Sequence, residues 1–209
     1  MTNVTGLLRQ MTSTTLNERT KKMKLILKNV QIIYPPNLFR ATLPPQASAD
    51  SLPRYSCAFL IDKNTDAYKE LMAVVDAECK EKLGEKWQVK AKAFKSNPQK
   101  YCVSDYVDSE GNETDFVMLK AYRKEADGRP IAVKRDRTQV DESEAVFYSG
   151  CFVNASVTIY VMSDTMKGGI RCGLTGVQFV KDGERHGASA PNINDFEEIE
   201  PDDSDDGLE

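Results

Sequence analysis

The most constraining feature of the sequence is a long apolar alternation that begins at Cys151. Every second residue from Cys151 to Val161 is apolar, whereas the residues between them include Asn154 and Thr158. A period of two places these two sets on opposite faces of an extended chain. Residues 145–163 carry no charge and are long enough to suggest a membrane span, but this alternation predicts a long two-faced β-strand instead.

Two other segments have strand patterns that end in clear stop signals. Residues 24–34 are rich in β-branched and aromatic side chains and are followed by two prolines, which cannot donate to a ladder. Residues 55–62 alternate in the same way as the long strand. Residues 169–180 predict the last strand, in which Gly173 and Gly176 interrupt the alternation and predict a bulge or bend.

Residues 115–124 and 131–137 predict a β-hairpin because the turn-like sequence EADGRP joins them. Residues 64–83 predict the one clear helix, with apolar residues at helical spacing, a cap at Asn64 or Thr65, and Gly84 after its end.

About six strands with one inserted helix and no βαβ alternation predict a mainly β fold, either all-β or α+β. A small Greek-key barrel fits best, with a sandwich as the alternative, because periodicity does not distinguish the two. The 209 residues are sufficient for one such domain.

The cysteines and the single histidine limit the available chemistry. The five cysteines lie at least 21 residues apart and form no C-x-x-C pair, so we expect free thiols, wholly or partly buried, in a reducing cytoplasm. Because His186 is the only histidine, the chain lacks most zinc ligand sets and any internal Cys-His or Ser-His arrangement. We therefore expect no metal and no cofactor. The first ten residues lack a basic stretch followed by a long apolar core, so we also expect no secretory signal.

Charge is divided sharply along the chain. Residues 193–209 contain nine acids and no base, whereas residues 1–192 contain 28 bases and 23 acids, a net charge of +5. We predict a flexible arm over 1–22, a folded domain over 23–192 and an acidic tail over 193–209. The tail is either a solubilising segment or a nucleic-acid mimic that occupies a basic groove of its own domain.

Basic residues are interleaved with aromatic ones over residues 80–101 and 120–137, and Phe152 and Tyr160 on the polar face of the long strand extend the set of rings. Ammonium and guanidinium groups neutralise phosphates, and aromatic rings stack on unpaired bases. On this basis we predict a continuous positive track that joins Lys120, Tyr122, Arg123 and Lys134. The residues predicted to contact nucleic acid are Lys90, Lys92, Lys100, Tyr101, Phe116, Lys120, Tyr122, Arg123, Lys124, Arg129, Lys134, Arg135, Arg137, Phe152 and Tyr160.

The sequence also resembles a known family. The run FYSGCFVNASVTIYV, then GGIRCGLTGVQFVKDGERHG, the opening LKNVQIIYPPNLF and the segment YSCAFLID before a helix are similar to the phage-encoded single-stranded-DNA-binding proteins. The similarity covers about residues 24–200 and is most specific over 148–187.

This resemblance implies an OB-fold barrel that binds single-stranded DNA without sequence preference in phage replication, recombination and repair. It also implies an acidic C-terminus that contacts replication or recombination proteins. Tails of this kind commonly end in Phe, whereas here Leu208 is the only apolar residue at the tip. The residues predicted to contact such partners are Asp202, Asp203, Asp205, Asp206 and Leu208.

We therefore expect a non-enzymatic single-stranded-DNA-binding protein in the cytoplasm of the infected bacterium, with no membrane association and as either a monomer or a dimer. One alternative is a barrel that binds protein and whose basic loops are merely solvated. The other is a metal-dependent nuclease that uses loop carboxylates such as Asp105 with Asp108, or Asp136 with Asp141.

Overall fold

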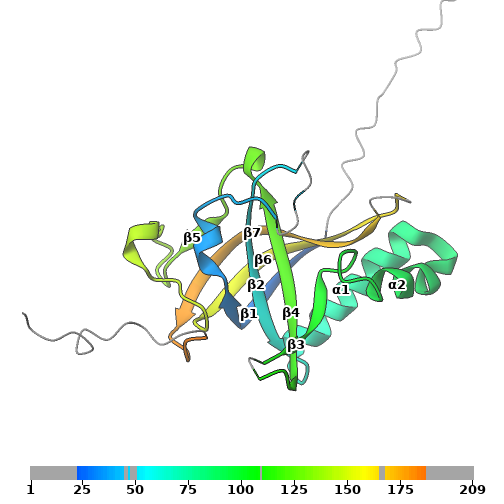
Figure 1. The fold of residues 1–209 in the computed structure, drawn as a ribbon, viewed down its shortest axis with the longest axis horizontal. Helices are drawn as coiled ribbons and strands as arrows, with labels where there is room; N and C mark the ends of the chain where they lie inside the picture. The colour runs from blue at the N-terminus through cyan, green and yellow to red at the C-terminus, as the bar shows by residue number, and fades with distance from the viewer. Residues whose placement is uncertain (1–22, 45–46, 48–50, 109, 165–167, 187–209) are drawn as a thin grey trace, which may run out of the picture.

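The structure is a computed structural model that describes residues 23–44, 47, 51–108, 110–164 and 168–186 (Figure 1). The predicted arm over 1–22 and the acidic tail over 193–209, including their expected disorder, lie outside these residues. The domain boundaries at 22 and 192 therefore stay predictions.

Seven strands form the described domain. The long strand from Cys151 and the strands expected at 24–34, 55–62 and 169–180 are all confirmed, and a short strand before residue 108 is an addition to the prediction. The strands are β1 (Met23–Ile33), β2 (Arg54–Asp62), β3 (Val103–Val107), β4 (Glu113–Lys124), β5 (Ile131–Val133), β6 (Phe152–Met162) and β7 (Gly169–Lys181).

Five of these strands close into a barrel. Strands β4, β2, β1, β6 and β7 pair in that order, all antiparallel, and β7 returns to β4 in parallel through Tyr122 and Gly173. Cys102 completes the closure, because its amide donates to the Ile170 carbonyl and its carbonyl accepts from the Lys120 amide. This closed order confirms the small Greek-key barrel, here an OB-fold, rather than a sandwich.

The hairpin predicted from 115–124 and 131–137 is wrong. Strand β4 pairs with β3 and β2, and β5 pairs in parallel with β7. The hairpin that does form joins β3 to β4, and next to these strands the Asp108 amide donates to the Asn112 carbonyl. Local turn residues led to the error, because partner choice in a barrel is set by contacts between strands that are distant in the sequence.

The bulge predicted in the last strand is present. Ser156 pairs with Gly176 but Val157 pairs with Leu174, so Thr175 is the extra residue in β7. Glycine is required at 176 because a Cβ there would lie 2.6 Å from the Ile131 carbonyl oxygen. This close approach allows β5 to pair with β7.

The helical insertion between β2 and β3 has two parts, one more than predicted. Helix α1 (Asp66–Leu83) is the predicted helix, and α2 (Trp87–Lys95) follows it; both extend to one side of the barrel (Figure 1). Short 3-10 helices occur at η1 (Pro35–Leu38), η2 (Gly84–Lys86), η3 (Glu125–Asp127) and η4 (Glu142–Glu144).

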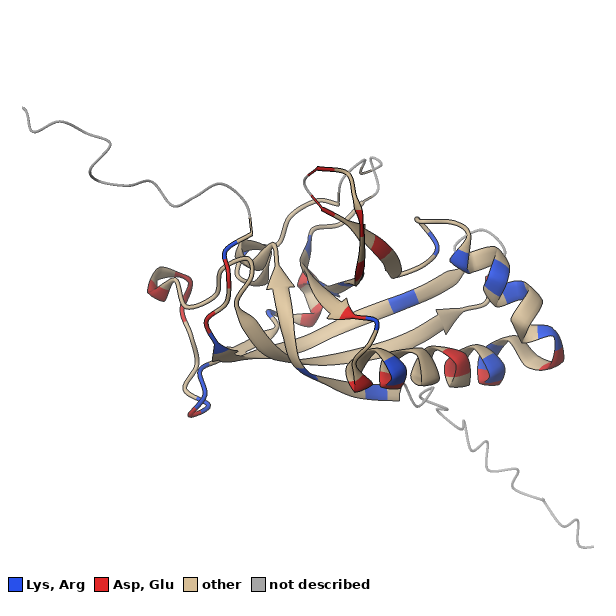
Figure 2. Cartoon of the chain, turned by 90° about the horizontal axis from the view of Figure 1, so that it is seen from below, with Lys and Arg blue, Asp and Glu red and all other residues tan. Residues whose placement is uncertain are grey.

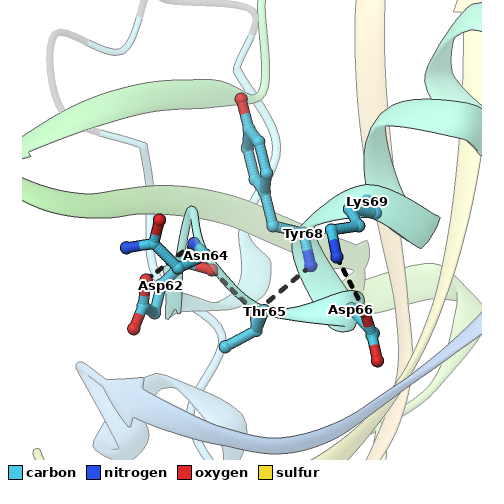
Figure 3. Close-up of polar contacts among 6 residues, drawn as sticks. All are labelled: Asp62, Asn64, Thr65, Asp66, Tyr68 and Lys69. Carbon is cyan, nitrogen blue, oxygen red and sulfur yellow. Dashed lines mark hydrogen bonds and ion pairs between the residues drawn. The ribbon is translucent and has the colours of Figure 1, made fainter.

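Thr65 caps α1, as the sequence indicated. Its hydroxyl accepts from the Tyr68 amide at 3.4 Å and donates to the Asp62 carbonyl at 2.6 Å, while the Tyr68 ring points away from the cap (Figure 3). The apolar residues Leu71, Val75 and Cys79 lie on the buried side of α1, which places this helix against the barrel.

Inward-facing residues of the barrel strands make one apolar core. The predicted inner faces of β4 and β6 are confirmed, since Val117, Leu119 and Ala121 and the odd-numbered residues of β6 are buried. Among the described helices none is long and apolar enough to cross a membrane.

All five cysteines are free and buried, as predicted. Burial raises the pKa of each thiol, for example that of Cys79 to about 11 and that of Cys102 to about 12. The folded state therefore holds neutral thiols, and above the unfolded thiol pKa of about 8.5 ionisation stabilises the unfolded chain.

We predict that a thiol reagent such as Ellman's reagent will not label the native protein at pH 8 but will label five thiols in guanidinium. The contribution of these thiols to the free energy of unfolding should not change with pH below pH 8. It should decline as the pH rises from about 8.5 towards the thiol pKa values of the folded protein. Rapid labelling of a native thiol would show that the protein opens locally around it.

Candidate nucleic-acid interface

A groove runs over the outer face of β2 and β4, and we call it the β2–β4 groove. It has a volume of about 470 Å³. Its walls are the segment after β1 on one side and β4 on the other, and β2 forms its floor. The lining residues are Tyr34, Asn37, Thr42, Leu43, Pro44, Arg54, Ser56, Cys57, Ala58, Met118, Lys120, Ala121 and Tyr122.

Strand register explains why this face is hollow. Ser56 pairs with Tyr122 and Ala58 pairs with Lys120, so small side chains on β2 lie beside large ones on β4. Paired residues in a sheet point to the same side, so the large side chains rise next to a low floor. Further along the same face Leu60 and Met118 join a small apolar cluster with Ile33, which fills the space and ends the groove.

An arginine and a tyrosine form the most specific feature of the groove. The guanidinium carbon of Arg54 lies 4.8 Å from the centroid of the Tyr122 ring, a cation–π contact. Partial burial lowers the pKa of Arg54, although Arg stays charged. The Tyr122 hydroxyl also lies 2.6 Å from that of Tyr160 on β6, and burial, followed by this hydrogen bond, raises the pKa of Tyr160.

Tyr34 forms the opposite rim and is 62% exposed. Its backbone is left-handed, with φ of 59°, which is rare for a bulky residue and is often associated with a functional constraint. The Tyr34 amide donates to the Ser149 hydroxyl at 3.2 Å, which holds the backbone at this position. The groove thus has the exposed ring of Tyr34 on one side and the half-buried ring of Tyr122 on the other. Arg54 and Lys120 supply positive charge to a lining that contains no Asp or Glu among its described residues.

Of the residues predicted from the sequence, only some come together here. Lys120 and Tyr122 line the groove, Tyr160 contacts Tyr122, and the exposed Lys124 pairs with Arg54 at its end. The expected continuous track is wrong, because two of its members lie elsewhere. Arg123 donates to the carbonyls of Asp127 and Gly128, and Lys134 forms an ion pair with Glu144.

The remaining predicted bases and rings are spread over other surfaces. Arg129 lies over the Phe39 ring at 5.5 Å, and Arg135 donates to the Val180 carbonyl. Arg137 lines a separate cavity over β1, β6 and β7, whereas Phe116 and Phe152 line a third cavity beside α1.

The Lys-rich segment near α2 is also separate from the groove lining. Lys90 donates to the Leu83 carbonyl, Lys92 is exposed on α2, and Lys100 lies half-buried beyond the helix. Tyr101 packs inward, with its hydroxyl 3.8 Å from the Met72 sulfur, and burial raises its pKa. Figure 2 shows basic and acidic bands side by side on the helices.

The loop carboxylates proposed for a nuclease serve local structure. Asp105 forms an ion pair with Lys63 at 2.8 Å, and Asp108 accepts from the amides of Glu110 and Asn112. Asp136 accepts from the Thr138 amide, and Asp141 caps η4. Within the described ranges no three Asp, Glu, His or Cys side chains converge on one point.

Sequence reasoning missed Tyr34 and Arg54. The period of two in β2 does place Arg54 on the same face as Ser56 and Ala58. Nothing local indicated that β2 pairs with β4, and this pairing brings Arg54 to Tyr122.

The chain belongs to a family of phage single-stranded-DNA-binding proteins. The family model described as "Enterobacter phage Enc34, ssDNA-binding protein" matches residues 23–208. A relative, "Putative protein p50" of Acyrthosiphon pisum secondary endosymbiont phage 1, is 31% identical over 185 residues, which cover 85% of this chain and 94% of the relative.

Solved structures show the same fold. The single-stranded DNA-binding protein from bacteriophage Enc34 in complex with ssDNA is similar with a TM-score of 0.60 and 21% identity, over 78% of this chain and 89% of that one. A C-terminal truncation of the Enc34 protein is similar with a TM-score of 0.57 and 18% identity, over 78% and 88%.

Proposed function

We propose that this protein binds single-stranded DNA in the β2–β4 groove, without sequence preference and without catalysis. The observation that carries the proposal is the groove itself, in which Arg54 lies on Tyr122, beside Lys120 and opposite the exposed ring of Tyr34. Rings stack on any unpaired base, and cations neutralise the phosphates that follow it. The outer face of these strands is also where OB-folds bind oligonucleotides.

Family membership supports the same function and its setting. The protein from phage Enc34 was solved in complex with ssDNA, and this chain has its fold. We propose roles in phage DNA replication, recombination and repair, in the cytoplasm of the infected bacterium. In these processes unpaired strands need protection and a means of recruiting enzymes.

The last described residues, 182–186, are held close to the groove. The Tyr148 hydroxyl donates to Asp182 at 2.9 Å, the His186 amide donates to the Ser149 carbonyl at 3.0 Å, and Ser149 also holds Tyr34. A Cβ at Gly150 would lie 1.8 Å from the Glu184 carbonyl oxygen, so glycine permits this close crossing.

Residue 186 thus lies near the rim of the groove, and a polyanion attached there has a high local concentration. We infer that the tail over 193–209 competes with DNA for the groove. DNA would release the tail, whose acids and Leu208 would then be available to replication or recombination proteins.

Removing the guanidinium group of Arg54 tests whether DNA binds in the β2–β4 groove. Arg54→Ala should weaken binding of a labelled oligo-dT by about tenfold, because it removes one charge and the support of the Tyr122 ring. Fluorescence anisotropy would measure the change. Arg137→Ala, on another face, is the matched control and should stay within about twofold. Equal losses in the two variants would contradict the assignment of the groove.

Salt provides a second test. Log affinity should fall linearly with log salt concentration at about 0.7 per phosphate neutralised. Lys120→Ala should lower this slope by about 0.7 relative to the unchanged protein, whereas Lys134→Ala should leave it unchanged because Lys134 is paired with Glu144. A slope that is flat for every variant would show that ion release does not drive binding.

Removing the tail tests the competition. Deletion of residues 193–209 should tighten oligo-dT binding by about tenfold at low salt, and the gain should vanish at high salt as charges are screened. A full-length variant with the nine acids changed to Asn or Gln separates charge from length and should behave like the deletion. Unchanged or weaker binding by either variant would remove the competition from the proposal.

A further inference from the structure

The outer face of β1, β6 and β7 carries a further cavity, which we call the β1–β6 cavity. It has a volume of about 340 Å³. Ile26 of β1 pairs with Ser156 of β6, which also pairs with Gly176 of β7. Gly176 pairs in turn with Ile131 of β5. The small residues in the middle of this row form the floor of the cavity, and an isoleucine lies at each end.

The lining of the β1–β6 cavity suits apolar side chains. Ile26 is 42% exposed and Ile131 is 55% exposed, so a segment that covered them would gain apolar burial. Val133 and Val177 add aliphatic surface to the lining, which contains no aromatic ring among its described residues. Unpaired bases bind by stacking on rings, so this cavity suits a peptide better than DNA.

The charge of the cavity favours an acidic peptide. Lys24 and Arg137 line it, both are exposed, and neither forms an ion pair within the described residues. The described lining contains no Asp or Glu. The balance stays positive when neighbouring charges are included, with the bases Lys24, Lys134, Arg135 and Arg137 against the acids Glu78, Asp136 and Glu144.

The C-terminal part of this chain has the matching chemistry. Residues 193–200 contain four acids and no base, and Ile193, Phe196 and Ile199 recur at every third position. Residues 1–22 also lie next to the cavity in the sequence, but they carry four bases and one acid. Their charge has the same sign as that of the cavity, so residues 193–200 are the better occupant.

The last described residue lies within reach of the cavity. A ring nitrogen of His186 is 3.4 Å from the Gln31 side-chain oxygen, and Gln31 pairs with Phe152. Ser156, in the floor of the cavity, is four residues further along β6, or about 13 Å. Residues 187–192 span up to about 20 Å when extended, so the segment that follows them can reach the cavity of its own chain.

The other end of the cavity lies towards the β2–β4 groove. Lys24 pairs with Thr158, which is two residues before Tyr160 on β6. The Tyr160 hydroxyl lies 2.6 Å from that of Tyr122, which lines the groove. A segment that crossed the cavity along β6 would therefore bring residues 201–209 close to the cations of the groove.

We propose that residues 193–200 dock in the β1–β6 cavity of their own chain, with their apolar side chains on Ile26 and Ile131 and their carboxylates near Lys24 and Arg137. The docked segment holds residues 201–209 beside the groove and so raises their local concentration there. The effect on DNA binding rests on the tail competition proposed above, whereas the docking itself can be tested without DNA.

A single cation contributes little to this docking, because an exposed ion pair is weak. Arg137→Ala should therefore tighten DNA binding by less than about twofold. This change is opposite in sign to the loss expected for Arg54→Ala, so Arg137→Ala still serves as the control for that variant.

Disulfide formation within one chain tests the docking. In the full-length Asn194→Cys, Ile131→Cys variant, we expect oxidation without DNA to join the two introduced cysteines. The native thiols are buried and do not compete. Asn194 is neither apolar nor acidic, so its replacement keeps the residues on which docking depends. Mass spectrometry of the digested monomer identifies the link.

Val107→Cys replaces Ile131→Cys in the control. Val107 is 48% exposed, similar to Ile131, and lies on β3, outside the lining of the β1–β6 cavity. It is within comparable reach of the C-terminal segment, because β3 pairs with β4, and Phe116 of β4 lines one cavity with Gln31. The control should form its disulfide about fivefold more slowly. Equal rates in the two variants would overturn the docking, as would links found only between chains.

Removing the apolar side chains of the segment tests its effect on DNA binding. Phe196→Ala with Ile199→Ala keeps all nine acids. This double variant should tighten oligo-dT binding at low salt by about threefold, because it releases the tail from the cavity. Leu208→Ala, in the same tail but outside the docked segment, is the control and should leave the affinity unchanged. Fluorescence anisotropy would measure both affinities.

An unchanged affinity of the double variant, in a protein whose affinity rises on deletion of residues 193–209, would overturn the proposal. An equal gain from Leu208→Ala would overturn it as well. If the deletion itself has no effect, the competition for the groove fails, whereas the disulfide still decides the docking.

Discussion

The pairing of β2 with β4 is the constraint on which the rest of the structure depends. It runs without interruption from Arg54 opposite Lys124 to Asp62 opposite Phe116, although the helical insertion separates the two strands in the sequence. Buried residues on the inner side, such as Phe59 and Leu119, fix the register, because a shift by one residue would move these side chains to the solvent face. The same register sets Ser56 and Ala58 beside Tyr122 and Lys120 on the outer side. Core packing and the groove are thus two sides of one ladder.

The outer face changes its chemistry along its length. Near Tyr122 it offers rings and cations, in the middle Leu60, Met118 and Ile33 fill it, and at Phe116 it borders carboxylates. Phosphate is favoured only over the first of these regions. The chemistry of the face therefore changes in one direction along β4, from Tyr122 to Phe116. Ser149 accepts hydrogen bonds from the amides of both His186 and Tyr34, so residue 186 lies close to the cationic region.

Much of the fold could be predicted because strand periodicity is local. The inner faces of β4 and β6, the cap at Thr65 and the bulge near Gly176 all follow from nearby residues. The β-hairpin predicted over 115–137 is wrong because the choice of pairing partner, unlike periodicity, is not local. Its turn sequence was compatible with a hairpin, but β5 gains more by pairing with β7, where Gly176 allows close approach. Helix α2 was missed because it has only nine residues, too few for the helical spacing of Trp87, Ala91 and Phe94 to identify a helix.

The sequence by itself determined which residues point inward, that the chain divides its charge between a basic body and an acidic end, and that it resembles a family of single-strand binders. Only the tertiary structure decided which of the many bases and rings share a surface. It brings Lys120 and Tyr122 together with Tyr34 and Arg54, and it gives Arg123 and Lys134 partners outside this groove. The physical reason is that side-chain direction follows from the local backbone, whereas neighbours across a barrel follow from hydrogen bonds between residues more than fifty positions apart.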